Sequence, residues 1–296
     1  MEQADINAID ARDELGRTQL WRAADSGDAQ RVTELLSRGA DVEARDRGGR
    51  SALIRTAAGN HLQTLIILLS AGADVAGSDA AAWTALHNAS MEGCLDVLQV
   101  LIQRGAVLEA RTNIGWTPLI LASLFERPEC CLALIAAGAD VTAGDIDGIT
   151  SLHYASRMGL PDVVRSLLEN GADPDIKDNN GETALSYCVR WWRQHPSNPA
   201  IADGSRKALV DALHGASLKK SLWAGRKLTV MLEARQSHGE DILRGAPCAA
   251  AATEGKFIDL VQWLVSRHEY GQHGLFRLVV GYLGERTEAV QWSEAE

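Results

Sequence analysis

Apolar positions along the chain recur at a constant interval. Leucine occupies six successive points of this period: Leu20, Leu53, Leu86, Leu119, Leu152 and Leu185. A hydroxyl residue precedes each leucine by two positions: Thr18, Ser51, Thr84, Thr117, Thr150 and Thr183. Glycine followed by alanine forms a third series: Gly39, Gly72, Gly105, Gly138 and Gly171. A constant step as long as that from Leu20 to Leu53 indicates an array of structural repeats, each packed mainly against its neighbours.

The third unit shows what each repeat is expected to build. Thr84 can cap a helix because its hydroxyl accepts a backbone N–H of the first turn. Apolar residues follow at helical spacing before and after Gly93, so this glycine lies between two helices, and Gly105 ends the second one. We expect positive φ at both glycines, and at their equivalents in the other repeats: Gly27, Gly39, Gly72, Gly138, Gly159 and Gly171.

Two repeats have another residue in place of the glycine between their helices. The second repeat has Asn60 there, and the fourth has Glu126 followed by Arg127 and Pro128. Asparagine adopts positive φ more readily than glutamate. The sequence therefore predicts an unchanged loop in the second repeat and a different path in the fourth.

These residues resemble the ankyrin repeat, whose motif is Thr-Pro-Leu-His, then glycine, then Leu-Leu, then Gly-Ala-Asp. The motif is matched most fully by Thr84-Ala85-Leu86-His87, Thr117-Pro118-Leu119, Thr150-Ser151-Leu152-His153 and Gly171-Ala172-Asp173. The resemblance covers about 18–187, six units in all. It implies an all-α fold, an α-solenoid of stacked helix-turn-helix repeats with β-hairpin or turn fingers. It also implies that His87 and His153 hydrogen-bond the neighbouring hairpin.

Three parts are expected along the chain. Residues 1–17 form a partial hairpin or cap, or the cut end of a longer array. Residues 18–215 hold the six repeats, with an inserted loop near 193–204 where Pro196 and Pro199 interrupt the helical pattern. The delayed helix is predicted at 205–214, with Gly215-Ala216 as its end; the rival register makes 204–216 a hairpin. Residues 216–296 are interpreted as degenerate repeats with a C-terminal cap.

Composition narrows the function classes. Lys and Arg number 29 against 39 Asp and Glu, a formal net charge of −10, which disfavours nucleic acid and anionic membranes as partners. No apolar run approaches the length of a membrane span, and the first residues lack a signal-peptide pattern. The five cysteines have no CxxC spacing, so neither a disulfide framework nor a zinc module is expected. We expect a cytoplasmic protein, with a nuclear location as the alternative.

Candidate chemistry is sparse. His87 and His153 are candidate bases, but they occupy the motif position of a structural histidine. Cys130 and Cys131 align with core positions of the other repeats, and adjacent cysteines on a helix rarely bond each other. No nucleophile, phosphate-binding or zinc-protease motif occurs. We expect no catalysis, no cofactor and no metal site.

The expected site is an apolar concave groove over the central repeats. Ankyrin arrays usually bind partners through the finger tips and the end of the first helix. Apolar residues at these positions are Trp83, Met91, Ile114, Trp116, Leu124, Phe125, Ile149, Met158 and Trp191. The first two repeats carry Arg17 and Arg50 at the corresponding tips. An exposed apolar patch of this kind is typical of a binding surface. The predicted partner is a protein, bound as a peptide, helix or loop with apolar anchors, and the free chain is expected to be a monomer.

Other interpretations stay open. The two tryptophans can pack on the adjacent hairpin instead of meeting a partner, and the 193–204 loop or the C-terminal tail can cover the groove. An enzyme or small-ligand site in the divergent region 190–296 is one alternative function. A self-associating structural module is another.

Overall fold

The computed structural model describes residues 9–194, 209, 211–213 and 215–217, without the side chains of 191–194. The chain divides between residues 219 and 220, so everything described belongs to its first part. The proposed degenerate repeats at 216–296 thus lie outside the described residues, except for 216 and 217.

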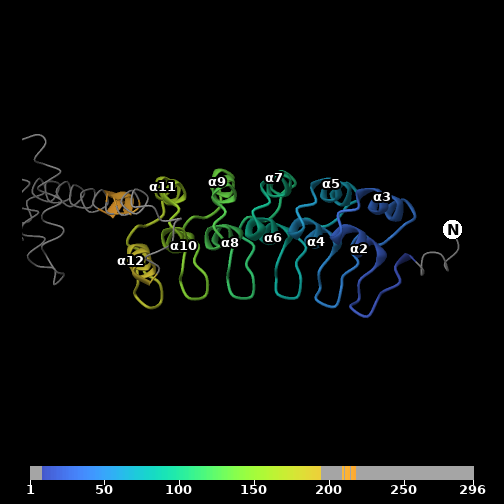
Figure 1. Ribbon diagram of the computed structural model, residues 1–296, viewed down its shortest axis with the longest axis horizontal. Helices are drawn as coiled ribbons and strands as arrows, with labels where there is room; N and C mark the ends of the chain where they lie inside the picture. The colour runs from blue at the N-terminus through green and yellow to red at the C-terminus, as the bar shows by residue number, and fades with distance from the viewer. Residues whose placement is uncertain (1–8, 195–208, 210, 214, 218–296) are drawn as a thin grey trace, which may run out of the picture. The chain divides into compact units, whose positions relative to one another are not determined.

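The described helices form two layers, with one helix of each repeat in each layer (Figure 1). The first helices of the repeats are α2 (Gln19–Asp25), α4 (Ala52–Ala58), α6 (Ala85–Glu92), α8 (Pro118–Leu124), α10 (Ser151–Met158) and α12 (Ala184–Gln194). The second helices are α3 (Ala29–Ser37), α5 (Leu62–Ser70), α7 (Leu95–Gln103), α9 (Pro128–Ala136) and α11 (Pro161–Glu169). Hydroxyl caps begin the first helices as predicted; for example, Thr84 accepts the backbone N–H of His87.

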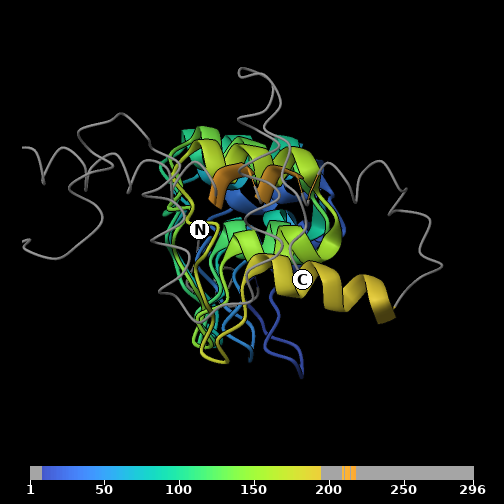
Figure 2. The same ribbon diagram turned by 90° about the vertical axis from the view of Figure 1, so that its left-hand side faces the viewer.

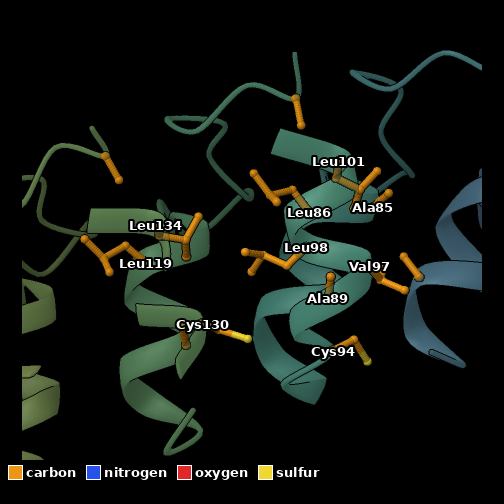
Figure 3. Packing of buried hydrophobic residues seen from close by; sticks show 14 of the residues in the cluster. Ala85, Leu86, Ala89, Cys94, Val97, Leu98, Leu101, Leu119, Cys130 and Leu134 are labelled. Atoms are coloured by element: carbon orange, nitrogen blue, oxygen red, sulfur yellow. The ribbon is translucent and has the colours of Figure 1, made fainter. Parts of the chain in front are cut away.

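The core runs through the stack between these two layers. Leu86 of α6 and Leu98 of α7 are fully buried, as are Val97 and Leu101. Figure 3 shows Leu98 and the thiol of Cys130 pointing into the space between the third and fourth repeats. A fully buried leucine contributes about 1.5–3 kcal/mol. One repeat alone leaves this surface exposed, so the free energy of folding depends on stacking.

Turns rather than strands connect successive repeats. Isolated antiparallel bridges close the second, third, fifth and sixth fingers, for example Ser78 with Thr84, and the described residues contain no continuous strand. Asp79 accepts the backbone N–H groups of Ala81 and Trp83, which holds the turn. The corresponding aspartates act in the same way in the other repeats except the fourth, where Thr112 replaces them. These are the fingers that the ankyrin resemblance implied.

Arginine and histidine side chains bridge successive repeats. Between repeats one and two, Arg12 donates to the carbonyl of Arg45 at 2.6 Å. Between repeats two and three, Arg45 donates to the carbonyl of Ser78; between repeats four and five, Arg111 donates to that of Gly144. At the intervening interfaces His87 and His153 donate instead, to the carbonyls of residues 116 and 182. Arg45 and Arg111 are separated by two repeat lengths, and so are the two histidines.

All glycines predicted at positive φ have it, with φ between 71° at Gly27 and 96° at Gly171. Asn60 also adopts positive φ, at 57°, as predicted. The prediction for the fourth repeat is wrong, because Glu126 has φ 58° and its loop follows the same path as the others. The helices on either side are packed against neighbouring repeats, so the loop between them is fixed despite the less favourable residue.

The sixth repeat corrects two boundaries. Helix α12 includes Arg193 and Gln194, which were assigned to the insertion; Pro196 disfavours helix only at the residue before it. The delayed helix is confirmed by helical residues at 209 and 211–213, so the rival hairpin register is wrong. Residues 215–217 are helical too, hence Gly215 does not end that helix, since glycine weakens a helix without necessarily ending it. Residues 195–204 lie outside the described residues.

Candidate functional site

The candidate site lies between the fingers and the first helices. Figure 2 looks along the stack and shows the fingers leaving the helices at one side, beyond the layer of first helices. We call the surface between fingers and first helices the inner face. Every residue predicted to bind a partner belongs, by its place in the repeat, to the finger end or the helix end of this face.

Two tryptophans form the centre of the finger end. The rings of Trp83 and Trp116 meet edge to face, with centroids 6.5 Å apart, and Trp83 also lies 6.0 Å from the ring of His87. Both tryptophans are half-buried. The interpretation that these rings pack on the adjacent finger therefore holds for part of their surface, while the remainder faces solvent.

Isoleucines in the turns of the fourth and fifth fingers are exposed to a larger fraction than the tryptophans are. Ile114 is 41% exposed, and the neighbouring Ile146 is 64% exposed. The backbone N–H of Ile146 donates to the carbonyl of Ile114 at 3.4 Å, so the two turns are in contact. Ile149, the third predicted finger residue, is half-buried. Sequence reasoning missed Ile146, although an isoleucine between two aspartates in a turn is itself a signal.

The helix end is a separate group. Phe125 follows α8 and is 41% exposed, whereas Met91, Leu124 and Met158 are half-buried. About eight residues at 1.5 Å each separate the two ends of a first helix, roughly 12 Å. The predicted residues therefore form two apolar groups on one face rather than one cluster. Trp191 lies in α12, and its side chain is outside the described residues.

Arginines surround an aromatic ring at the N-terminal end of the inner face. Trp21 is only 4% exposed, and the guanidinium carbons of Arg17, Arg50 and Arg55 lie 5.5, 6.0 and 5.5 Å from its ring centroid. Its indole N–H donates to the carbonyl of Arg50 at 3.1 Å. Trp21 precedes His87 by two repeat lengths and makes the same link to the next finger. Nothing in the repeat pattern of the sequence had predicted Arg55 as part of this surface.

His87 and His153 are structural, as the resemblance implied. The backbone N–H of Thr84 donates to Nδ1 of His87, which leaves the proton on Nε2, and Nε2 donates to the carbonyls of Ala110 and Trp116. His153 is bound in the same way by Thr150 and Glu182. Burial lowers the pKa of both imidazoles. Neither ring can reach a substrate from the interior.

The four cysteines that the structure describes are buried and offer no reactive thiol. Cys130 and Cys131 are buried in α9, and burial raises their thiol pKa values to about 11 and about 12. Thiols with such pKa values are poor nucleophiles near neutral pH. Within residues 9–194 and the short described stretches beyond, no three His, Cys, Asp or Glu side chains are grouped to hold a metal. The described helices include none with the length and hydropathy of a membrane span.

Comparison with known proteins agrees with this architecture. A family model for ankyrin repeats in three copies matches residues 76–145, and a second, for ankyrin repeats in many copies, matches residues 134–188. No curated protein matches the chain. Together with the stacked helix pairs and their fingers, these matches show that the chain carries ankyrin repeats, over residues 76–188 in the family comparison.

Proposed function

We propose that the chain is a non-catalytic protein-interaction module and that its inner face binds a peptide, helix or loop of another protein. Ankyrin repeats are generally modules of this kind and are typically without catalysis. The observation that carries the proposal is the exposure of Ile114 and Ile146 on two neighbouring fingers and of Phe125 at the end of α8. Exposed apolar side chains grouped in this way favour a partner that removes them from water.

The expected anchors are the predicted residues together with Ile146. Trp83 and Trp116 are half-buried beside the finger turns, and Phe125 lies at the other end of α8. A partner that spans both ends must therefore extend for roughly 12 Å along the first helix, about the length of four extended residues. We propose a free monomer and a cytoplasmic location, with the nucleus as the alternative, on the grounds of charge and cysteine usage given above.

Selection from random peptides displayed on phage tests this proposal with the full chain. We expect the wild-type chain to enrich peptides that contain aromatic or aliphatic anchors. The affinity for the enriched peptides should fall by about tenfold or more in each of three variants: Ile114→Ser, Ile146→Ser and Phe125→Ala. The reason is that a desolvated apolar anchor contributes about 1.4 kcal/mol or more to binding. Leu132→Ser is the matched control, since Leu132 lies on the outer helix α9 with a similar exposure of 39%.

The outcomes separate the alternatives. If the three variants and the Leu132→Ser control weaken peptide binding equally, the binding site lies elsewhere. Failure to enrich any peptide would contradict the proposal. Concentration-dependent sedimentation of the chain alone, lost in Ile146→Ser, would favour the self-associating module instead. Trp116→Ala is a weaker test, because its ring also packs on Trp83 and its loss is expected to lower stability.

A further inference from the structure

Charge is distributed unevenly along the described repeats. Residues 9–60 contain nine arginines and nine acidic residues, whereas residues 61–190 contain seven basic and sixteen acidic residues. The first two repeats are therefore neutral, and the later ones carry a formal charge of −9. Any local excess of positive charge on the inner face must come from the first two repeats, where Arg17, Arg50 and Arg55 surround Trp21.

Acidic side chains fix these three guanidinium groups without using all of their donors. Arg17 binds Asp13 through Nε at 2.9 Å, and Arg50 binds Asp46 through Nε and Nη2 at 2.9 and 2.8 Å. Arg55 binds Asp25 of the preceding repeat through Nε and Nη2, at 2.9 and 2.5 Å. Within the described part of the chain, Nη1 of each arginine makes no hydrogen bond. The three side chains are thus oriented around the ring with a free N–H edge.

Arg22 adds a charge with no partner at all among the described residues. It is exposed, and its position in α2 is the one that Arg55 occupies in α4, one repeat later. Arg55 binds Asp25 of the preceding repeat, whereas no described residue takes that role for Arg22. The four arginines outnumber their three aspartates, so the cluster has a formal charge of +1 in a chain of −10.

The cluster continues the row of finger residues that includes the tryptophans. Arg17, Arg50, Trp83 and Trp116 occupy one position in four successive repeats. A peptide that covers the tryptophan pair and extends toward the N-terminal repeats therefore meets the arginines next. Guanidinium groups with free N–H pairs match carboxylates, to which they form strong charge-assisted hydrogen bonds.

We propose that the ligand of the inner face is an acidic peptide segment, in which carboxylates next to the apolar anchors bind Arg17, Arg22, Arg50 and Arg55. This inference rests on the proposed function and specifies its partner. Local carboxylates fit better than a long polyanion such as nucleic acid, because the −9 charge of residues 61–190 repels an extended negative chain. The arginines supply the polar specificity, and the central repeats supply the apolar contacts.

The peptides enriched by the wild-type chain provide the test. We expect an excess of Asp and Glu beside the apolar anchors, and binding that weakens as salt is raised, since exposed charges are screened over about 10 Å at 0.1 M. Arg22→Glu should weaken the binding of these peptides by about tenfold or more. Its unfolding transition should shift only slightly and by about as much as that of the control, because both arginines lie at the C-terminal end of a helix without a bonded partner among the described residues. Arg104→Glu is the control, an exposed arginine at the end of the outer helix α7 with no side-chain bond among the described residues.

Each result decides between the two proposals. Peptides without acidic excess, or equal affinity in Arg22→Glu and wild type, would overturn the acidic ligand. If Phe125→Ala still abolishes the binding of the enriched peptides in that case, the proposed function is retained without the acidic ligand. If neither variant has an effect, both proposals fail. Self-association of the chain that Arg22→Glu abolishes would identify the acidic repeats of a second copy as the occupant and overturn the peptide.

Discussion

Replacing Glu126 by glycine is expected to stabilise the protein. Glu126 joins α8 to α9 with φ 58°, a left-handed conformation that glycine adopts at the equivalent points of the first, third and fifth repeats. Its side chain is exposed and forms no hydrogen bond or ion pair with a described residue. The substitution therefore changes little besides the backbone preference of one residue.

The expected gain follows from two opposing effects. A residue with a Cβ atom in the left-handed region is disfavoured by roughly 1–2 kcal/mol relative to the right-handed helix. Glycine also has a more flexible unfolded state, which lowers stability by about 0.4–1 kcal/mol. The difference predicts that Glu126→Gly raises the free energy of unfolding by about 0.5–1 kcal/mol.

Urea titration of the full chain followed by circular dichroism measures this change, with Glu92→Gly as the matched control. Glu92 is also exposed but is the last residue of α6 and has helical backbone angles. Glycine there should lower stability by about 0.5–1 kcal/mol. The two variants should thus shift the transition in opposite directions. A loss of stability in Glu126→Gly equal to that in Glu92→Gly would refute the argument.

Three further variants test the packing. The free energy of unfolding should be about 0.5–1.5 kcal/mol higher in Thr64→Val than in Thr56→Val, because the buried Thr64 hydroxyl has no partner in the described structure while that of Thr56 donates to a backbone carbonyl. Equal shifts of the urea midpoint in the two variants would contradict this. Burial lowers the pKa of His87 and His153, so below the ordinary value of 6.5 the unfolded chain takes up protons first, and stability should fall between about pH 7 and 5. The double variant with alanine at both positions should show a flatter pH dependence in urea titrations; an unchanged slope would assign the effect to other groups. Gly105→Val should lower stability by more than about 1 kcal/mol, since φ is 83° although the added side chain meets open space, and an unchanged thermal midpoint would reject the backbone argument.

Sequence reasoning predicted the repeats because the apolar period, the caps and the glycines all agree. It failed at Glu126 because it considered one residue's preference alone. In the structure, the helices on both sides are held by neighbouring repeats, and this packing outweighs a penalty of roughly 1–2 kcal/mol.

The candidate site was predictable in position but not in exposure. The repeat frame places Trp116 and Ile149 at the ends of their fingers, yet how much of each side chain is covered depends on the finger beside it. Trp83 is partly covered by Trp116, whereas Ile146 has little covering it. The arginine cluster was missed for a similar reason. Its members are far apart in sequence, and ion pairs with Asp13, Asp46 and Asp25 orient them around Trp21 only in the folded chain.

The bridging side chains have a consequence for lengthening the array. Arg45 and Glu43 are matched two repeats later by Arg111 and Glu109, and His87 is matched at the same distance by His153. The acceptors of the arginines and histidines are backbone carbonyls, which every repeat supplies. A second copy of residues 46–111 inserted after Arg111 would therefore extend the inner face while each new bridging side chain again met a carbonyl one repeat later.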